Sequence, residues 1–221
     1  MPRAPVHRMK KVDIVRLSRW RCKHGETGLS HYNCYITENP DLERVCFLDL
    51  ECSNLSADFG IILSYAIADE KSDTIYSRII TKRELQTCLD KKIVENCLKD
   101  LKNFDRVVTY YGSNFDIPFL RTRAVALGIP FFEFGELIHN DLYYTIRNRF
   151  KLSRNRLDNA CMSLLGNTEK TRITAEYWIK ALMGDPQSLA YILDHNIKDV
   201  QELKRLYQKV LTYRKKTDTS L

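Results

Sequence analysis

Two carboxylates stand two residues apart inside an otherwise apolar run, VCFLDLECSNL, at residues 45–55. If this run is a β-strand, Asp49 and Glu51 project to the same side of it, while Leu50 faces the other way. Two carboxylates that close repel each other, and a divalent cation between them removes the conflict. The pair therefore indicates a site for Mg²⁺ or Mn²⁺. The alternative is a strand end with two solvated acids, because Asp-x-Glu after an apolar run is common.

Two further stretches supply acids that could join this pair. TYYGSNFDIPFLRTRA places Asp116 just beyond a predicted strand and at the start of a predicted helix, where open α/β sheets build their sites. YILDHNIKDVQEL puts His195 and Asp199 four residues apart, on one face of the last predicted helix. Each stretch also has a simpler interpretation: Asp116 could be only a helix N-cap, and His195 only a surface histidine.

Taken together, these residues resemble the DEDD exonucleases of the ribonuclease-H-like superfamily. The most specific stretch is NFDIPFLRTR, which follows the pattern N-F-D-x-P-(Y/F)-L-x-x-R of the proofreading exonuclease domain in B-family DNA polymerases. The residues that fall on this pattern are Asn114, Phe115, Asp116, Pro118 and Arg123. The likeness covers residues 44–212, and we expect a free-standing member of the family because no polymerase domain accompanies it.

The resemblance implies a metal-dependent 3′–5′ exonuclease that acts on DNA or RNA, with single-stranded ends as the expected substrate. Two Mg²⁺ or Mn²⁺ ions about 3.5–4 Å apart would activate the attacking water and stabilise the leaving 3′ oxygen. By this likeness, Asp49 would bridge both ions, and Asp116 would bind one of them mainly through water. Glu51 and Asp199 would hold the ion that carries the nucleophile. The alternatives are a structure-specific endonuclease of the same fold and a non-catalytic nucleic-acid-binding module.

The third motif departs from the pattern of the family. The tyrosine subclass has Tyr-x-x-x-Asp and the histidine subclass has His-x-x-x-x-Asp, whereas this chain places His195 at the tyrosine spacing from Asp199. A histidine here could orient or deprotonate the attacking water, since the ordinary pKa of histidine lies near working pH. It could equally point away from the position of a general base. The spacing therefore leaves both the subclass and the role of His195 open.

A second cluster of chemically active side chains lies near the amino terminus, in RCKHGETGLSHYNCY. It contains Cys22, His24, His31 and Cys34. Two thiolates and two imidazoles suit tetrahedral Zn²⁺, and four protein ligands leave no open position, so the ion would be structural. The alternative is a pair of buried thiols beside loop histidines.

Charge and aromatic residues indicate a polyanionic partner. The net charge is +7, and basic residues concentrate at residues 3–23 and 214–216. Such clusters suit nucleic acid, although solvated tails would look the same. Tyr110, Tyr111 and Phe115 could stack on bases beside the cleft, or could belong to the core. Asn114, Phe115, Tyr111 and Arg123 are the expected substrate contacts.

The cellular location is predicted from what the chain lacks. No apolar stretch approaches the length of a membrane span, and the opening MPRAPVHRMKKVD lacks the apolar region of a secretory signal. We therefore expect a cytoplasmic protein. Its seven cysteines are then expected to be thiols or metal ligands rather than disulfides.

The elements that must position these side chains follow from the apolar periodicity. We expect three strands in an antiparallel meander, then a helix with one stripe of Leu85, Leu89, Ile93, Cys97 and Leu101, and then two more strands and several helices. The expected strands are residues 44–52, 61–69, 73–81, 105–112 and 136–144. The expected helices are residues 82–101, 116–128 with a glycine C-cap, 143–150, 156–165, 174–183 and 187–213. The predicted fold is α/β, a mixed sheet flanked by helices, which by resemblance is ribonuclease-H-like. Residues 41–215 would form this domain, after a basic extension over residues 1–40 that carries the possible zinc loop.

Overall fold

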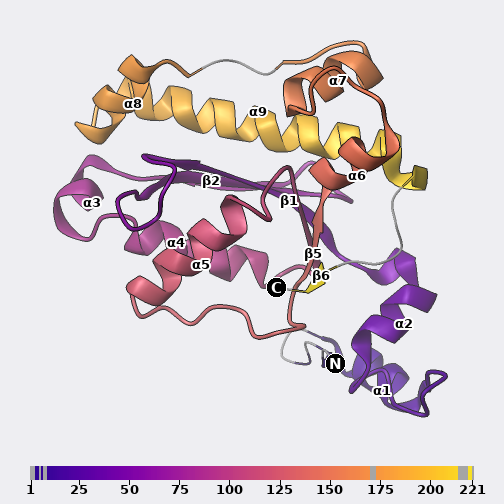
Figure 1. The fold of residues 1–221 in the computed structure, drawn as a ribbon. Coiled ribbons are helices and arrows are strands. Elements are labelled where there is room, and N and C mark those ends of the chain that lie inside the picture. The colour runs from indigo at the N-terminus through magenta and orange to yellow at the C-terminus, as the bar shows by residue number, and fades with distance from the viewer. Residues whose placement is uncertain (1–2, 5, 7–8, 170–172, 214–218, 221) are drawn as a thin grey trace.

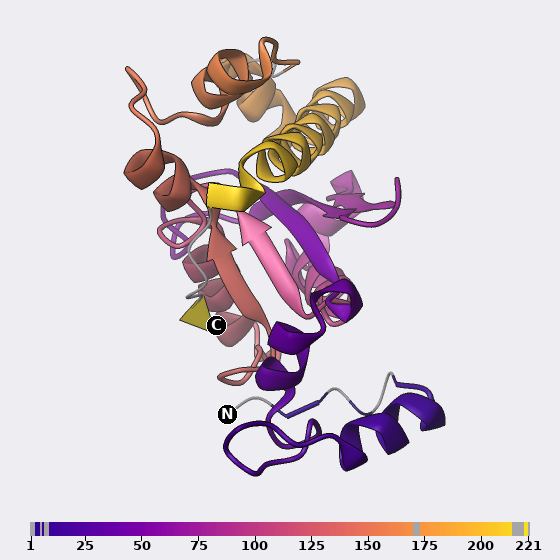
Figure 2. The same ribbon diagram turned by 90° about the vertical axis from the view of Figure 1, so that its right-hand side faces the viewer.

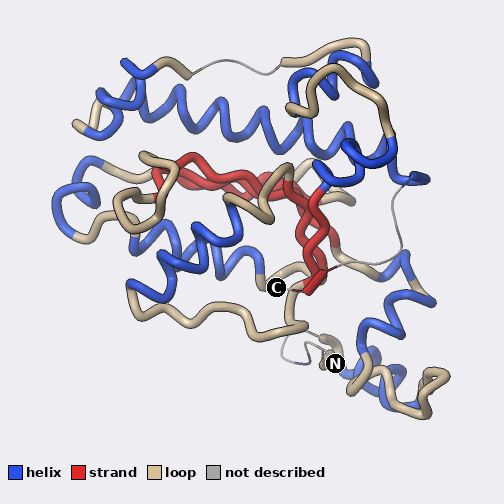
Figure 3. The backbone as a smooth tube through the Cα atoms, viewed as in Figure 1, coloured by secondary structure: helices blue, strands red, loops and turns tan. Residues whose placement is uncertain are grey.

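The computed structural model describes residues 3–4, 6, 9–169, 173–213 and 219–220 (Figure 1). Parts of the predicted basic clusters, Arg8 and residues 214–216, lie outside these ranges, as does the predicted domain end at residue 215. Within the described ranges the chain forms a sheet with helices on both faces, and a small helical extension lies at its amino-terminal side (Figure 3).

Within the described residues, the sheet has six strands in the order β3-β2-β1-β4-β5-β6. The strands are β1 (Val45–Cys52), β2 (Ile62–Asp69), β3 (Ile75–Ile79), β4 (Arg106–Thr109), β5 (Ile138–Asp141) and β6 (Thr219–Ser220). The first three pair antiparallel, β4 runs parallel to β1, and β5 runs parallel to β4. The predicted mixed sheet with its antiparallel meander is therefore confirmed. The short β6, which pairs antiparallel with β5, is a strand that the sequence did not predict.

Two helices belong to the amino-terminal extension, α1 (Lys11–Arg19) and α2 (Tyr32–Glu38). The other described helices follow the first strand: α3 (Lys82–Thr87), α4 (Lys91–Leu101), α5 (Asp116–Ala126), α6 (Leu142–Arg149), α7 (Leu157–Leu165), α8 (Ala175–Leu182) and α9 (Pro186–Val210). Single 3₁₀ turns lie at Pro40–Leu42 and Leu211–Tyr213. Helices α4 and α5 lie on one face, and α9 crosses the other (Figure 1). Gly128 follows α5 with a φ of +69°, which confirms the predicted glycine at the end of this helix.

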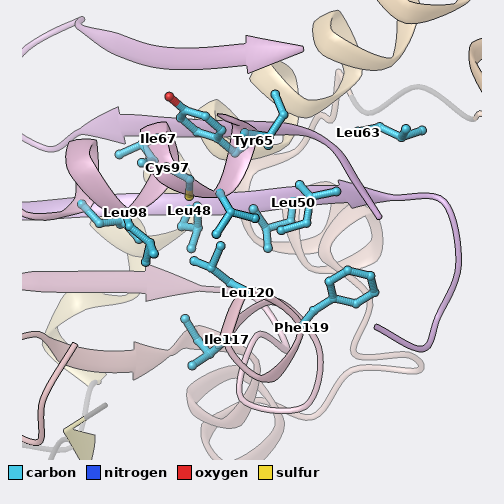
Figure 4. Close-up of a cluster of buried hydrophobic side chains, with 14 of the residues drawn as sticks. Leu48, Leu50, Leu63, Tyr65, Ile67, Cys97, Leu98, Ile117, Phe119 and Leu120 are labelled. Carbon is cyan, nitrogen blue, oxygen red and sulfur yellow. The ribbon is translucent and has the colours of Figure 1, made fainter. Parts of the chain in front are cut away.

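Strand β1 sorts its side chains between two cores by simple alternation. Cys46, Leu48 and Leu50 enter the core beneath α4 and α5, together with Tyr65 and Ile67 of β2 (Figure 4). The other face buries Val45 and Phe47 against α9 (Leu203, Leu206 and Tyr207). Each fully buried apolar side chain contributes about 1.5–3 kcal/mol. The two cores therefore fix β1 between α4 and α5 on one face and α9 on the other.

The predicted helix over residues 82–101 is wrong in one respect, because the chain breaks it after Thr87. Leu89, which the predicted stripe placed in the core, has a φ of +50° and is 44% exposed. The reason is Asp90, which is completely buried. Its carboxylate accepts hydrogen bonds from the Ile62 N–H and from the Arg123 guanidinium. To bury this carboxylate, the chain turns between Thr87 and Lys91, although the apolar periodicity alone predicts that the helix continues.

Candidate active site

Strand β1 places the first pair of acids on the α9 side of the sheet. Asp49 and Glu51 continue the alternation of Val45 and Phe47, whereas Leu50 belongs to the core on the other face. The side chain of Glu51 is 14% exposed. The chain therefore carries two partly buried carboxylates to the α9 side of the sheet.

Helix α9 brings His195 and Asp199 close to Glu51. The Nε2 atom of His195 lies 3.5 Å from Oε1 of Glu51 and 3.7 Å from Oδ2 of Asp199. One ligand atom from each of these three side chains lies within 4.8 Å of the others, which is the spacing of a metal-binding group. Both α9 residues are buried, as expected for positions one turn apart on a helix that packs on the sheet.

Asp49 is held by a residue that the sequence analysis missed. The amide of Asn196 donates a hydrogen bond of 2.6 Å to Oδ2 of Asp49, and its carbonyl accepts one of 3.0 Å from the Ser64 hydroxyl. Asn196 is fully buried. The sequence does contain a sign that Asn196 is buried. It lies four residues after Ile192 and four before Val200, within the apolar stripe of α9. A buried amide in such a stripe requires a polar partner.

Asp116 reaches the site from the beginning of α5, but its carboxylate does not cap that helix. Its Oδ1 atom accepts a hydrogen bond of 3.0 Å from the Leu50 N–H. Strand β4 ends at Thr109, so β1 extends past its parallel neighbour and Asp116 takes the place of the missing strand. The interpretation of Asp116 as a simple N-cap is therefore wrong.

The pKa of Asp116 is raised from its ordinary value of 3.8 to about 7, mainly because the carboxyl group is buried. The negative charges of Asp141 and Asp199 raise it further, while the hydrogen bond from the Leu50 N–H opposes the shift. Asp141 itself ends β5 and accepts hydrogen bonds from the Tyr111 and Ser113 N–H groups. It thereby fixes the loop that leads from β4 to Asp116.

In the presence of a chelator, the stability of the protein is expected to fall as pH rises from about 4 to about 7 through the ionisation of Asp116. Its folded-state pKa lies above the unfolded value, so in this window the folded protein holds a proton that the unfolded chain has released. Thermal unfolding across this range would measure the slope. Asp116→Asn, which keeps an oxygen for the Leu50 N–H, should flatten it, and Asp194→Asn, an exposed acid on α9, should not. Equal slopes in all three proteins would contradict the prediction.

The predicted substrate contacts fall into two groups. A pocket of about 340 Å³ is lined by Asp49 and Asp199 together with Tyr110, Tyr111 and Tyr143. Tyr111 is 47% exposed and has a φ of +69°, a conformation that a tyrosine rarely adopts. Tyr110 is held more deeply, and its hydroxyl donates to the Asn155 carbonyl.

The other predicted contacts are engaged by the protein itself. The Asn114 amide donates to the Tyr144 hydroxyl at 2.7 Å on the protein surface. The Phe115 ring packs 5.5 Å from the Phe119 ring against the core. Arg123 does not line the pocket. Two of its nitrogens instead donate hydrogen bonds of 2.7 and 2.8 Å to the Asp90 carboxylate. Its match to the family pattern therefore has a structural explanation.

The second predicted cluster also assembles. Ligand atoms of Cys22, His24, His31 and Cys34 all lie within 4.8 Å of one another. This cluster stands in the amino-terminal extension, apart from the group on β1 and α9. The group of Glu51, His195 and Asp199 and the group of four Cys and His residues are thus separate in the described part of the chain.

Comparisons with known proteins concern the sheet and its helices. Residues 46–211 match the family model of the RNase H superfamily. The chain is 30% identical over 174 residues to a DNA polymerase of Methanocaldococcus jannaschii, and this alignment takes in 64% of the chain and 10% of that polymerase. The fold is similar to the family B DNA polymerase of Pyrobaculum calidifontis, with a TM-score of 0.62 and 21% identity over 76% of this chain and 24% of the polymerase. The chain therefore spans about a tenth and about a quarter of the lengths of these two proteins.

Proposed function

The chain belongs to the RNase H superfamily, which confirms the resemblance seen in its motifs, and from this premise we propose that it is a metal-dependent 3′–5′ exonuclease. It would hydrolyse phosphodiester bonds of DNA or RNA, with single-stranded ends as the preferred substrate. The cofactor would be a pair of Mg²⁺ or Mn²⁺ ions, because the site offers mainly carboxylate oxygens.

The observation that carries this proposal is the burial of several acids in one place. Glu51 and Asp199 both lie within 4 Å of the same His195 nitrogen, and Asp49 shares their face of the sheet. Burying carboxylates together is costly unless positive charge accompanies them. Burial, together with the charges of Asp141 and Asp199, likewise raises the pKa of Asp116. Divalent cations would remove the cost of burial, so the donor set fits the ions that the superfamily suggests.

Each acid then has a definite task. Asp49, whose carboxylate is oriented by Asn196, and Asp116 would both help to hold the ions. Glu51 and Asp199 would hold the ion that carries the attacking water. When bound, the two ions lower the pKa of that water and stabilise the leaving 3′ oxygen.

His195 would act on the water rather than on the leaving group. Its Nε2 atom faces the Glu51 and Asp199 carboxylates at 3.5 and 3.7 Å, so it lies beside the position where these two acids would hold the nucleophile. A neutral imidazole there can accept a proton at Nε2 and pass it to solvent. In the metal-free protein, a charged imidazolium at the same place would offset the two carboxylates.

The nucleic acid would enter through the pocket beside Asp49. The exposed ring of Tyr111 offers a stacking surface for a base at the rim of this pocket, and Asn114 lies at the surface of the same loop. Stacking of this kind does not depend on base sequence, so we expect degradation of any sequence. Phe115 supports the loop from the core side, and Arg123 is not included among the proposed contacts.

The assay that tests the proposal follows single-stranded DNA and RNA oligonucleotides labelled at the 5′ end, with Mg²⁺, Mn²⁺ or a chelator. A 3′–5′ exonuclease produces a ladder that shortens with time and needs the metal. Release of the labelled nucleotide alone would indicate the opposite polarity, and cleavage of a circular single strand would indicate an endonuclease. Binding of intact oligonucleotides with no cleavage under any condition would leave a binding module and overturn the proposal.

Removing the side chain of Asn196 is expected to slow hydrolysis by about 10–100-fold without abolishing it, the usual range for loss of an outer-shell partner of a metal ligand. Asn196→Ala takes away the 2.6 Å hydrogen bond that orients Asp49. The measurement is the single-turnover rate at saturating metal, together with the metal concentration needed for half-maximal rate, which should rise. Lys198→Ala is the matched control, since Lys198 lies two residues on in α9 and pairs with Asp194. An unchanged rate in Asn196→Ala would contradict the role of positioning residue.

The remaining proposals concern organisation and location. We propose the division predicted from the sequence, with an extension over residues 1–40 and the nuclease over residues 41–215. The proposed location is the cytoplasm. Among the described residues, no helix combines the length and the apolar composition needed to cross a bilayer.

A further inference from the structure

The amino-terminal extension carries a cluster that the proposed nuclease chemistry does not use. It lies below the end of the sheet where β1 begins, away from the carboxyl ends of the strands (Figure 2). The family match begins only at residue 46, so the cluster falls outside it. The cluster consists of Cys22, His24, His31 and Cys34.

The distances between the ligand atoms are those of a tetrahedral site. The Cys22 sulfur lies 3.5 Å from Nδ1 of His24 and 3.5 Å from Nδ1 of His31, and the Cys34 sulfur lies 3.8 Å from Nδ1 of His24. Zn–S bonds of about 2.3 Å and Zn–N bonds of about 2.0–2.1 Å at tetrahedral angles separate sulfur and nitrogen by about 3.5 Å. The four side chains thus already surround a volume that fits one zinc ion.

Local backbone structure explains how the first ligand pair is presented. Arg21 and Thr27 form an isolated antiparallel bridge, and the Cys22 N–H donates to the Glu26 carbonyl at 3.0 Å. Gly25 turns the chain with a φ of +82°, and its N–H donates to the Cys22 carbonyl. This tight loop holds Cys22 and His24 on its inner side.

Helix α2 presents the second pair. His31 is its N-cap residue, and Cys34 follows three residues later in the first turn, so the two side chains share one side of the helix. Gly28, between the two ligand pairs, allows the chain to pack closely on α1, because a Cβ atom there would lie 2.7 Å from the Leu17 side chain. The ligands therefore join the loop to α2, and the contact of Gly28 with Leu17 places α1 beside them.

The apolar core of the extension is too small to explain why these segments fold. Its buried residues among those described are Ala4, Leu17, Tyr32, Tyr35 and Ile36. Segments with so little buried apolar surface usually need a disulfide or a metal ion. Cys22 and Cys34 are not joined to each other in a disulfide. A metal ion held by all four side chains would cross-link the loop to α2.

We propose that Cys22, His24, His31 and Cys34 hold one structural Zn²⁺ that folds the extension. All four positions of the ion are taken by protein, so it has no open site for a substrate and does not join the hydrolysis. This inference goes beyond the proposed nuclease function and does not depend on it, because its tests measure metal content and folding only.

The test measures zinc in the full chain purified under reducing conditions. All proteins compared carry Glu51→Gln and Asp199→Asn, so that the catalytic group does not contribute bound metal. We expect one zinc per chain by elemental analysis and native mass spectrometry. Cys34→Ser should weaken zinc binding by at least about 100-fold, more than the loss of an outer-shell partner usually does. Cys88→Ser, a partly exposed thiol elsewhere in the chain, should retain the ion.

A second pair of variants keeps the test decisive if Cys34→Ser folds poorly. His24→Cys creates a three-cysteine, one-histidine set that also binds zinc, so it should retain the ion, whereas His24→Ala should lose it.

Limited proteolysis tests the folding role of the ion. Chelation should make trypsin cut within residues 11–38 while residues 45–213 stay intact. Zinc retained by both Cys34→Ser and His24→Ala, a Cys22–Cys34 disulfide in the purified chain, or equal trypsin resistance with and without zinc would each overturn the proposal.

Discussion

Asp49→Asn is expected to lower the rate of phosphodiester hydrolysis by at least about 1000-fold. Asp49 is one of the acids proposed to hold the metal ions, and the loss of several kcal/mol of transition-state stabilisation corresponds to a rate change of this size. Asparagine has nearly the same shape and can still accept the hydrogen bond from Asn196, so the fold should be preserved. The measurement is the single-turnover rate on 5′-labelled single strands with saturating Mn²⁺.

Two controls separate chemistry from folding in this experiment. Asp194→Asn removes an exposed acid from the helix that carries His195 and Asp199, and it should leave the rate within about two-fold, as exposed ion pairs contribute little. The melting temperature of Asp49→Asn measured with a chelator should not fall below that of the unaltered protein. A rate for Asp49→Asn within ten-fold of the unaltered protein would remove Asp49 from the proposed metal site.

Arg123→Ala is expected to reduce the free energy of unfolding by about 3–5 kcal/mol, which is the usual cost of removing one partner of a buried ion pair. The side chain of Asp90 is completely buried and that of Arg123 is 12% exposed. The substitution would leave the Asp90 carboxylate inside the protein with the hydrogen bond from the Ile62 N–H but without the two from the guanidinium. Urea unfolding at neutral pH measures the effect.

The neighbouring Arg121 provides the matched control. Its guanidinium lies 5.2 Å from the centre of the Phe131 ring, a contact worth about 0.5–1 kcal/mol at an exposed site, so Arg121→Ala should cost little. Asp90→Asn combined with Arg123→Met should recover part of the stability, because it removes the buried charge and keeps an acceptor for Ile62. A stable Arg123→Ala protein with weakened binding to single strands would instead support the substrate contact predicted from the family pattern.

Much of the candidate site could be predicted from short stretches of sequence. A strand sends alternate residues to opposite faces, so the common face of Asp49 and Glu51 follows from their spacing alone. The same local logic placed Asp116 at the start of a helix and grouped Cys22 with Cys34 near two histidines. These predictions depend on backbone geometry over a few residues, which the types and spacing of residues determine.

What the sequence could not determine are the contacts between segments far apart in the chain. Asn196 and Asp49 are 147 positions apart, and their hydrogen bond exists because α9 docks across β1. Asp116 meets the Leu50 N–H because β4 ends before β1 does. Arg123 turns inward because Asp90 is buried beside it, and the same burial breaks the helix at Leu89. Periodicity determines which way a side chain faces within its own element, but only the packing of elements against one another decides which partner it meets.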